Sequence, residues 1–181
     1  MEHSVIFAGF GGQGLLFAGQ VLAQAAMNED REVLWIPTYG PEMRGGTAAC
    51  TVIIGDRPIG SPVVDAFWAA VVLNPPSLAK FTPLVAPGGI LIVNATLIET
   101  PSGRSDIDEL RVPCTQLARE AGDDRLVSIA ALGALVGRTE LISPEALDAA
   151  LAEILGRKHP GALVSDLAVF ARGLSFGRAA H

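Results

Sequence analysis

Six residues near the N-terminus have the spacing of a glycine-rich, anion-binding turn. They match the pattern G-x-G-x-x-G between an expected strand and an expected helix: Gly9, Phe10, Gly11, Gly12, Gln13 and Gly14. Glycine tolerates positive φ and lets a backbone, phosphate or ligand come close, while the first N–H groups of the next helix point toward it. The Gln13 amide can both donate and accept, which suits a cofactor or partner contact. The turn therefore predicts a place where an anion could dock.

Two other interpretations of this turn stay open. The first is an NAD site. Such a site normally has a carboxylate near the end of the second strand, which binds the ribose of NAD, whereas this chain has Ile36–Tyr39 (Ile-Pro-Thr-Tyr) there. No lysine follows the turn, so it is not a P-loop for nucleoside triphosphates. The glycines could also serve only to permit a tight turn and close packing of the helix on the sheet.

A second glycine-rich segment stands where the second expected strand ends, which is the edge at which doubly wound sheets bind ligands. It combines an acid, a base and an aromatic ring with flexible glycines: Tyr39, Gly40, Glu42, Met43, Arg44 and Gly45. In a purely structural role, Glu42 and Arg44 would pair with each other or hold loop carbonyls. Asn74 follows a further expected strand and could line the same cleft, although such an asparagine more often caps the following turn.

The elements that must position these residues follow from periodicity and turn signals. Strands are expected at Ser4–Gly9, Glu32–Tyr39, Thr47–Ile54, Trp68–Leu73, Ile90–Val93 and Leu110–Val112, and helices at Leu15–Ala26, Ser77–Leu84, Thr115–Ala121, Leu126–Gly137, Ser143–Leu155 and Pro160–Leu174. Alternation of strand and helix implies parallel strands with right-handed crossovers. We therefore expect one α/β domain over residues 1–181: a three-layer, mostly parallel Rossmann-like sheet with helices on both faces and a helical C-terminal part.

Composition and charge restrict the function. Half of the 181 residues are hydrophobic and 18% are charged, which favours a single folded core. A formal net charge of −6 gives no electrostatic reason to approach nucleic acid or an anionic membrane, and the longest apolar run, Ala66–Leu73, is too short to span a bilayer. The N-terminus has no basic region of an export signal, so we expect a cytoplasmic protein. Cys50 and Cys114 lack the spacing of a metal or redox site and are expected to be buried thiols; no metal site is expected.

Four segments together resemble one protein family. Gly9–Gly14, Tyr39–Thr47, Ile59–Pro62 and Pro87–Asn94 are similar to the gamma subunit of 2-oxoacid:acceptor (ferredoxin) oxidoreductases, the pyruvate/ketoisovalerate oxidoreductase catalytic-domain family. The likeness is close over residues 4–94 and holds in outline for the helical remainder. The run Pro-Glu-Met-Arg-Gly-Gly looks most like the 2-oxoglutarate and branched-chain 2-oxoacid members.

The resemblance implies a subunit of an oxidoreductase that acts on the oxo group of donors and is inactive alone. In the complex, a 2-oxoacid and coenzyme A give acyl-CoA and carbon dioxide while ferredoxin is reduced, with thiamine diphosphate and iron-sulfur clusters as cofactors. Its implied partners are alpha and beta subunits, possibly a delta subunit, and ferredoxin through the complex. No cofactor and no catalytic residue is assigned to this chain alone.

Two hypotheses remain open for the role of the two glycine segments. Either they help to hold coenzyme A or its phosphates, or they form an interface clamp against partner subunits. The isolated chain is expected to form a homodimer, because surface intended for partners would otherwise be exposed. An NAD(P)-binding oxidoreductase and a non-catalytic scaffold subunit are the competing classes of function.

Overall fold

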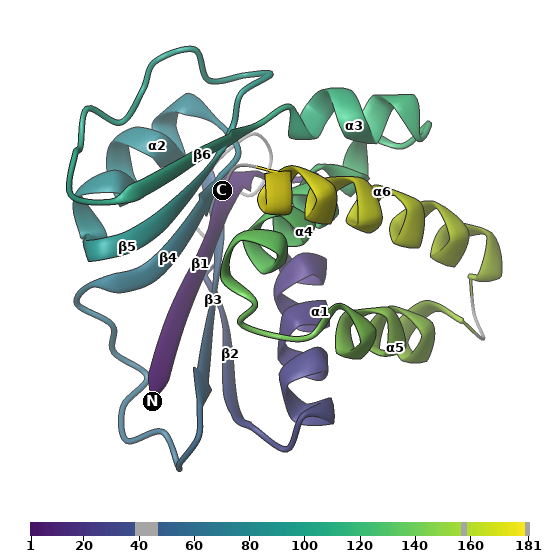
Figure 1. The fold of residues 1–181 in the computed structure, drawn as a ribbon, viewed down its shortest axis with the longest axis horizontal. Coiled ribbons are helices and arrows are strands. Elements are labelled where there is room, and N and C mark those ends of the chain that lie inside the picture. The colour runs from purple at the N-terminus through teal and green to yellow at the C-terminus, as the bar shows by residue number, and fades with distance from the viewer. Residues whose placement is uncertain (39–46, 157–158, 180–181) are drawn as a thin grey trace.

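A computed structural model describes residues 1–38, 47–156 and 159–179 (Figure 1). The strands are β1 (Glu2–Phe10), β2 (Glu32–Thr38), β3 (Thr47–Gly55), β4 (Phe67–Val72), β5 (Val85–Asn94) and β6 (Asp108–Val112). The helices are α1 (Leu15–Asn28), α2 (Pro75–Phe81), α3 (Cys114–Glu120), α4 (Val127–Thr139), α5 (Pro144–Leu155) and α6 (Pro160–Ala179), with short 3-10 helices η1 (Thr82–Leu84) and η2 (Asp124–Leu126). The expected elements are therefore observed, with boundaries shifted by a few residues.

The sheet has the strand order β2-β3-β1-β4-β5-β6 among the described residues. The pairs from β1 through β4 and β5 to β6 are parallel, whereas β3 runs antiparallel to both of its neighbours. Only eight residues, 39–46, separate β2 from β3. A parallel return needs a crossover of about a dozen residues or more, so this short connection forces the antiparallel direction. The prediction of a mostly parallel Rossmann-like sheet is confirmed.

Helices cover both faces of the sheet, but unevenly. Figure 1 shows α2 on one face and α1 with α3 to α6 on the other. Alternation along β1 divides the core accordingly: Val5 and Phe7 join the larger cluster, and Ile6 and Ala8 join the smaller cluster beneath α2. The two faces of the sheet thus carry separate hydrophobic cores.

The apolar helix α4 is covered by its own chain. Every residue from Val127 to Gly137 is buried, and α6 crosses directly over this helix. Glycines make the close crossing possible: a Cβ at Gly173 would lie 2.0 Å from the carbonyl oxygen of Ala130, and one at Gly133 would lie 2.3 Å from the carbonyl oxygen of Phe170. The apolar surface of α4 is therefore covered by α6 and by the sheet.

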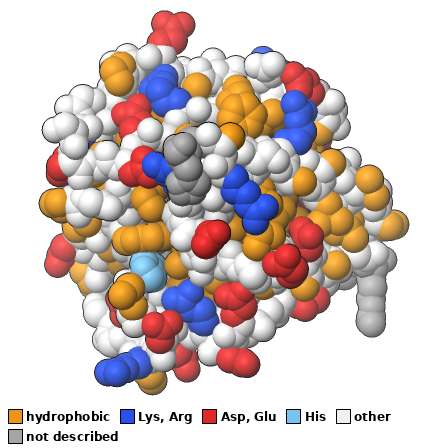
Figure 2. All heavy atoms as spheres, in the orientation of Figure 1, with side chains coloured by type: hydrophobic (Ala, Val, Ile, Leu, Met, Phe, Trp, Pro, Cys, Tyr) orange, Lys and Arg blue, Asp and Glu red, His pale blue; other side chains and the backbone are white. Residues whose placement is uncertain are grey.

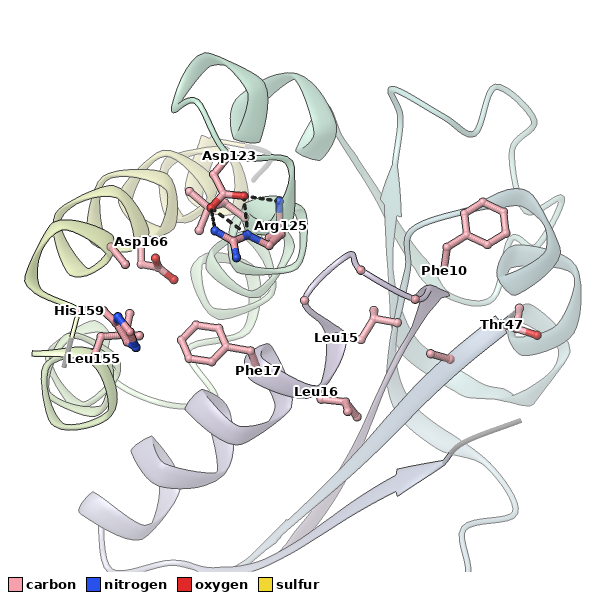
Figure 3. Close-up of a pocket in the computed structure, with 16 residues that line it drawn as sticks. Phe10, Leu15, Leu16, Phe17, Thr47, Asp123, Arg125, Leu155, His159 and Asp166 are labelled. Carbon is pink, nitrogen blue, oxygen red and sulfur yellow. Dashed lines mark hydrogen bonds and ion pairs between the residues drawn. The ribbon is translucent and has the colours of Figure 1, made fainter. Parts of the chain in front are cut away.

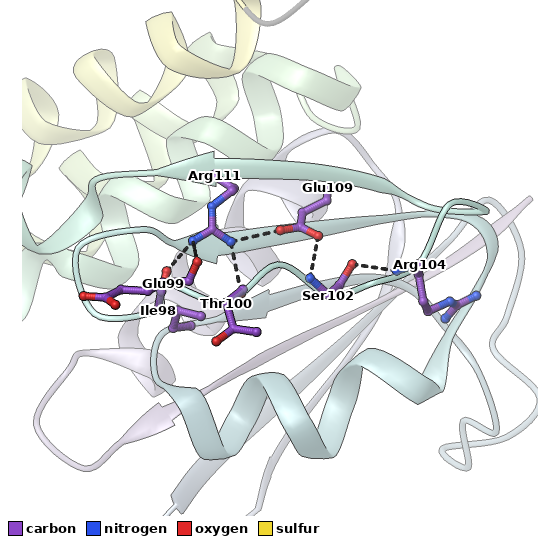
Figure 4. Close-up of polar contacts among 7 residues, drawn as sticks. All are labelled: Ile98, Glu99, Thr100, Ser102, Arg104, Glu109 and Arg111. Atoms are coloured by element: carbon purple, nitrogen blue, oxygen red, sulfur yellow. Dashed lines mark hydrogen bonds and ion pairs between the residues drawn. The ribbon is translucent and has the colours of Figure 1, made fainter.

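Two arginines hold the segment between β5 and β6 over the smaller core (Figure 4). Arg111 donates hydrogen bonds to the backbone carbonyls of Ile98, Glu99 and Thr100 and pairs with the Glu109 carboxylate at 3.0 Å. Arg104 donates to the carbonyl oxygens of Thr82 and Val85 at 2.9 and 2.6 Å. These bonds satisfy loop carbonyls that lack partners in regular structure. The bonds hold the segment in place at a side of the sheet that lies away from the glycine turn.

The surface mixes charged and hydrophobic side chains. Figure 2 shows acidic and basic groups interspersed over the face drawn, with hydrophobic atoms among them. Several large hydrophobic side chains are exposed, including Val164 at 70% and Met27 at 50%. None of the helices in the described part of the chain is long and apolar enough to cross a membrane.

Candidate functional site

A cavity of about 650 Å³ opens beside the glycine turn (Figure 3). It lies at the carboxyl end of β1, where the antiparallel register places Thr47 of β3 opposite Phe10. Five separate stretches of chain supply its walls: Phe10, Gly11, Gly12, Gly14, Leu15, Leu16 and Phe17; Thr47 and Ala48; Asp123, Arg125 and Leu126; Leu155; and His159, Ala162 and Asp166. Most of this lining is apolar, and a few polar groups converge on it, which is the usual make-up of a small-molecule site.

The glycine turn is closed by a reciprocal pair of hydrogen bonds. The Phe10 N–H donates to Gln13 Oε1 at 2.7 Å, and the Gln13 N–H donates to the Phe10 carbonyl oxygen at 3.3 Å. A Cβ at Gly9 would lie 2.4 Å from that same Gln13 oxygen. The acceptor atom of Gln13 is therefore engaged inside the turn, and Gly9 makes room for it.

Two of the glycines serve different purposes. Gly14 has φ of 76° as the N-cap of α1, and a Cβ there would lie 2.5 Å from the carbonyl oxygen of Arg125. Close packing within the chain thus accounts for Gly14. Gly12 has φ of 91° but open space around the position of its missing Cβ. The backbone at Gly12 is exposed and accessible to a group from outside the chain.

The first turn of α1 forms the positively polarised wall of the cavity. Its N-cap, Gly14, makes no side-chain hydrogen bond, and the first turn contains no acidic residue. The N–H groups of Leu15, Leu16 and Phe17 therefore have no side-chain acceptor from the cap, and the helix dipole adds a partial positive charge there. This wall favours an anion or a hydrogen-bond acceptor.

The opposite wall carries the ionisable groups. Asp123 accepts hydrogen bonds from Arg125 Nε at 3.0 Å and Nη2 at 2.7 Å, and these bonds hold the pKa of Asp123 below its ordinary value. Asp166 on α6 is only 4% exposed, and its Oδ1 has no hydrogen-bond partner. Burial, together with the charge of Asp123, raises the pKa of Asp166 to about 6 against the opposing effect of Arg125. Asp166 thus lines the cavity with a buried side chain whose Oδ1 is unpaired and closed to solvent.

The residues expected from the sequence are only partly brought together. Phe10, Gly11, Gly12 and Gly14 line the cavity. The second set lies outside the described residues: Tyr39, Gly40, Glu42, Met43, Arg44 and Gly45. Asn74 is fully buried and does not line the cavity; its Oδ1 accepts the Ser77 N–H at 2.9 Å as the cap of α2. The capping role offered as the alternative for Asn74 is the one that the structure displays.

Four polar residues of the cavity were not anticipated: Asp123, Arg125, His159 and Asp166. They follow the glycine turn by more than a hundred residues, and tertiary packing alone brings them to it. A signal did exist for Asp166, because Val169, Phe170 and Gly173 are buried at helical spacing from it. A lone acid on the apolar face of a helix is a marked departure from the binary pattern.

The described residues contain no cluster of three or more histidine, cysteine or acidic side chains suited to a metal ion. Cys50 and Cys114 are unpaired and buried. Burial raises the pKa of the Cys50 thiol to about 11 and that of Cys114 further still. A four-thiolate cluster cannot be built from the two cysteines of this chain.

A mostly parallel α/β sheet with a glycine turn and a cavity at the carboxyl end of its first strand defines a Rossmann-like α/β domain. The family model described as pyruvate ferredoxin/flavodoxin oxidoreductase matches residues 4–176, and the chain belongs to that family. The family expected from the glycine segments is confirmed.

Similar proteins support this assignment over most of the chain. The 2-oxoglutarate synthase subunit KorC of Methanocaldococcus jannaschii is 32% identical, with 96% of this chain and 92% of KorC covered. The ketoisovalerate oxidoreductase subunit VorA of Methanothermobacter thermautotrophicus is 43% identical over 135 residues, but this chain spans only 28% of the length of VorA. The crystal structure of the keto/oxoacid ferredoxin oxidoreductase gamma subunit from Geobacter sulfurreducens has a TM-score of 0.84 at 27% identity and covers 98% and 99% of the two chains.

Proposed function

We propose that this chain is the gamma subunit of a 2-oxoacid:ferredoxin oxidoreductase. The complex converts a 2-oxoacid and coenzyme A to acyl-CoA and carbon dioxide and reduces ferredoxin. The observation that carries this proposal is the end-to-end correspondence with the KorC subunit and with the Geobacter gamma subunit, with no large part of either chain left over. Partner alpha and beta subunits, possibly with a delta subunit, supply the rest of the enzyme.

The cofactor chemistry belongs to those partners. Thiamine diphosphate supplies carbanion chemistry and iron-sulfur clusters carry electrons when they are bound. This chain's residues do not fit a cluster, since it has two separated, buried cysteines. We assign no catalytic residue to it. Its contribution is binding and assembly, and it is inactive alone.

The glycine turn serves coenzyme A in this proposal. The amides at the start of α1 and the open backbone at Gly12 suit a phosphate, and Arg125 stands at the rim of the cavity with 79% of its side chain exposed. Replacement of Arg44 or Arg125 by alanine should raise the KM for coenzyme A roughly tenfold, while the complex still assembles. An unchanged KM in both variants would count against this role.

The alternative role is an interface clamp, favoured by the same open space at Gly12. Gly12→Val should then prevent copurification with the alpha and beta chains. The isolated variant must retain its fold, which circular dichroism would check. Normal assembly of the complex with this variant would exclude the clamp.

We propose 2-oxoglutarate as the substrate, supported by the KorC relative, of which 92% is covered by the match. The test is coexpression with candidate alpha and beta chains, followed by coenzyme A-dependent viologen reduction with 2-oxoglutarate, 2-oxoisovalerate and pyruvate. The highest kcat/KM should belong to 2-oxoglutarate. A preference for 2-oxoisovalerate would correct the substrate while leaving the subunit role in place; failure to copurify would refute that role.

For the isolated chain we propose a homodimer, because exposed hydrophobic side chains such as Val164 and Phe176 favour association. Light scattering would measure its mass. A strictly monomeric chain at all concentrations would contradict this proposal.

A further inference from the structure

The two halves of helix α6 are held in place very differently. In the second half, Gly173 and Gly177 are buried, and backbone carbonyl oxygens of α4 lie directly against them. The first half borders the cavity, and Gly161 in its first turn weakens the helix and has open space around it. Most side chains of this half are exposed: Pro160, Gly161, Ala162, Val164 and Ala168. The first half of α6 is therefore the part of the helix that opens most readily.

Asp166 lies where the two halves of α6 meet, and Figure 3 shows it across the cavity from Phe17. Its side chain is 4% exposed, and Oδ1 is closed to solvent and has no hydrogen-bond partner. An ionised carboxyl group in such a place has lost its water and gained no partner, which destabilises the packed arrangement; the neutral form loses much less. Movement of the first half of α6 away from the body of the molecule would return the carboxylate to water. Ionisation of Asp166 therefore favours the open arrangement of this half, and protonation favours the closed one.

The charged groups around Asp166 do not remove this dependence on ionisation. Asp123, at the start of η2, adds repulsion; Arg125 adds attraction, but its guanidinium group is bonded to Asp123. His159 lines the same cavity, and α1 contributes no charged residue. The other charged groups on elements near α6 are the pairs Glu120–Arg172, Asp108–Arg138 and Arg119–Asp124 and the acids Glu145, Asp148 and Glu153 of α5. No group among the described residues donates a hydrogen bond to Asp166 Oδ1.

We propose that residues 160–168 form a movable wall of the cavity, which closes when Asp166 is protonated and opens when it is ionised. In the closed arrangement, burial and the charge of Asp123 raise the pKa of Asp166 from 3.8 to about 6, against the opposing effect of Arg125. Acidification from about pH 6 to about pH 4 therefore closes the wall, and above about pH 6 its open population no longer rises. This inference goes beyond the proposed function, because it concerns access to the cavity and depends neither on the ligand nor on the subunit role.

Amide hydrogen exchange of the full isolated chain tests the inference. The protection of amides 164–168, corrected for the chemical exchange rate, should fall roughly twentyfold from about pH 4.5 to about pH 7.5. Low urea should not change it, because opening of two helical turns exposes little surface. Amides 5–8 of the central strand β1 should be much better protected and should respond to urea, because they exchange through unfolding of the whole chain.

Four variants assign the effect to Asp166. Asp166→Asn has nearly the same shape and no charge, so the pH dependence of amides 164–168 should disappear. Arg125→Gln removes the cation that favours the ionised carboxyl group, so the midpoint should move to higher pH. Asp124→Asn changes an exposed carboxylate of η2, and His159→Gln removes the other titratable group near α6 in the cavity lining; both should keep the wild-type dependence.

Two results with the wild-type chain would overturn the inference, so a folding defect in a variant cannot hide the answer. One is equal protection of amides 164–168 at both pH values. The other is exchange of these amides at the rate and with the urea dependence of β1, because α6 would then open only when the whole chain unfolds. Persistence of the pH dependence in Asp166→Asn would also overturn it, as would its loss in His159→Gln, which would assign the titration to the histidine.

Discussion

Replacement of Asp166 by asparagine should stabilise the protein at neutral pH. The side chain is 4% exposed, its Oδ1 has no hydrogen-bond partner, and its pKa rises from the ordinary 3.8 to about 6. Between these two pKa values the folded state therefore holds a proton that the unfolded state has already released. A difference of this size corresponds to about 3 kcal/mol of lost stability once both states are ionised. Asparagine has nearly the same shape and no charge, so it removes most of that cost.

The sign of the pH dependence follows from the raised pKa. Below about pH 4 the carboxyl group is protonated in both states and costs nothing. As the pH rises from about 4 to about 6, the free energy of unfolding of the wild type should fall relative to the variant, and above that range the difference should stay constant. The charged groups near the carboxyl are Asp123 and Arg125, with His159 lining the same cavity.

Urea denaturation at about pH 4.5 and about pH 7.5 measures both free energies. The variant should gain about 1 to 3 kcal/mol relative to the wild type at the higher pH, and distinctly less at the lower pH. Asp124→Asn changes an exposed carboxylate of η2 and should show no such gain. Equal stability of Asp166→Asn and wild type at both pH values would refute the claim that this carboxyl group is buried and unpaired.

Three further predictions concern packing. Gly173→Ala should lower the free energy of unfolding by about 1 to 3 kcal/mol, because the new Cβ would overlap a carbonyl group of α4. Gly161 has open space around it, so Gly161→Ala should be neutral or slightly stabilising. Thermal melts of the two variants measure the difference. Gly14→Ala should destabilise the fold more than Gly12→Ala. Both glycines have positive φ, but only Gly14 also packs against a backbone carbonyl group. Urea titration of the two variants measures the difference. Arg111→Met should speed amide hydrogen exchange in the segment between β5 and β6 without changing exchange in β1.

The fold could be predicted from the sequence because its strongest signals are local. Short apolar runs, the glycine turn and the Ser143-Pro144 helix start locate nearly every element. The antiparallel direction of β3 could also have been predicted, because a connection of eight residues from β2 is too short for a helical crossover. The burial of α4 by α6 depends on glycines of two separate helices that meet only in three dimensions.

The candidate site was predictable only on the side formed by the glycine turn. The turn carries its own pattern, but its partners Arg125 and Asp166 come from the C-terminal half of the chain, and no spacing rule connects them to Gly14. Glycine is needed at position 14 because a Cβ there would lie against the Arg125 carbonyl oxygen. A sequence pattern around Gly14 does not contain this contact. Asn74 was predicted to line the cleft because it lies at the end of a strand. Its side chain instead caps α2 by accepting the Ser77 N–H.

The subunit role is tested most directly by omission and return of this chain. Alpha and beta subunits prepared without it should show little viologen reduction with 2-oxoglutarate and coenzyme A, and addition of the purified chain should restore the rate in proportion to the complex formed. Full activity of the alpha and beta subunits in its absence, or turnover of a 2-oxoacid by this chain alone, would contradict the account.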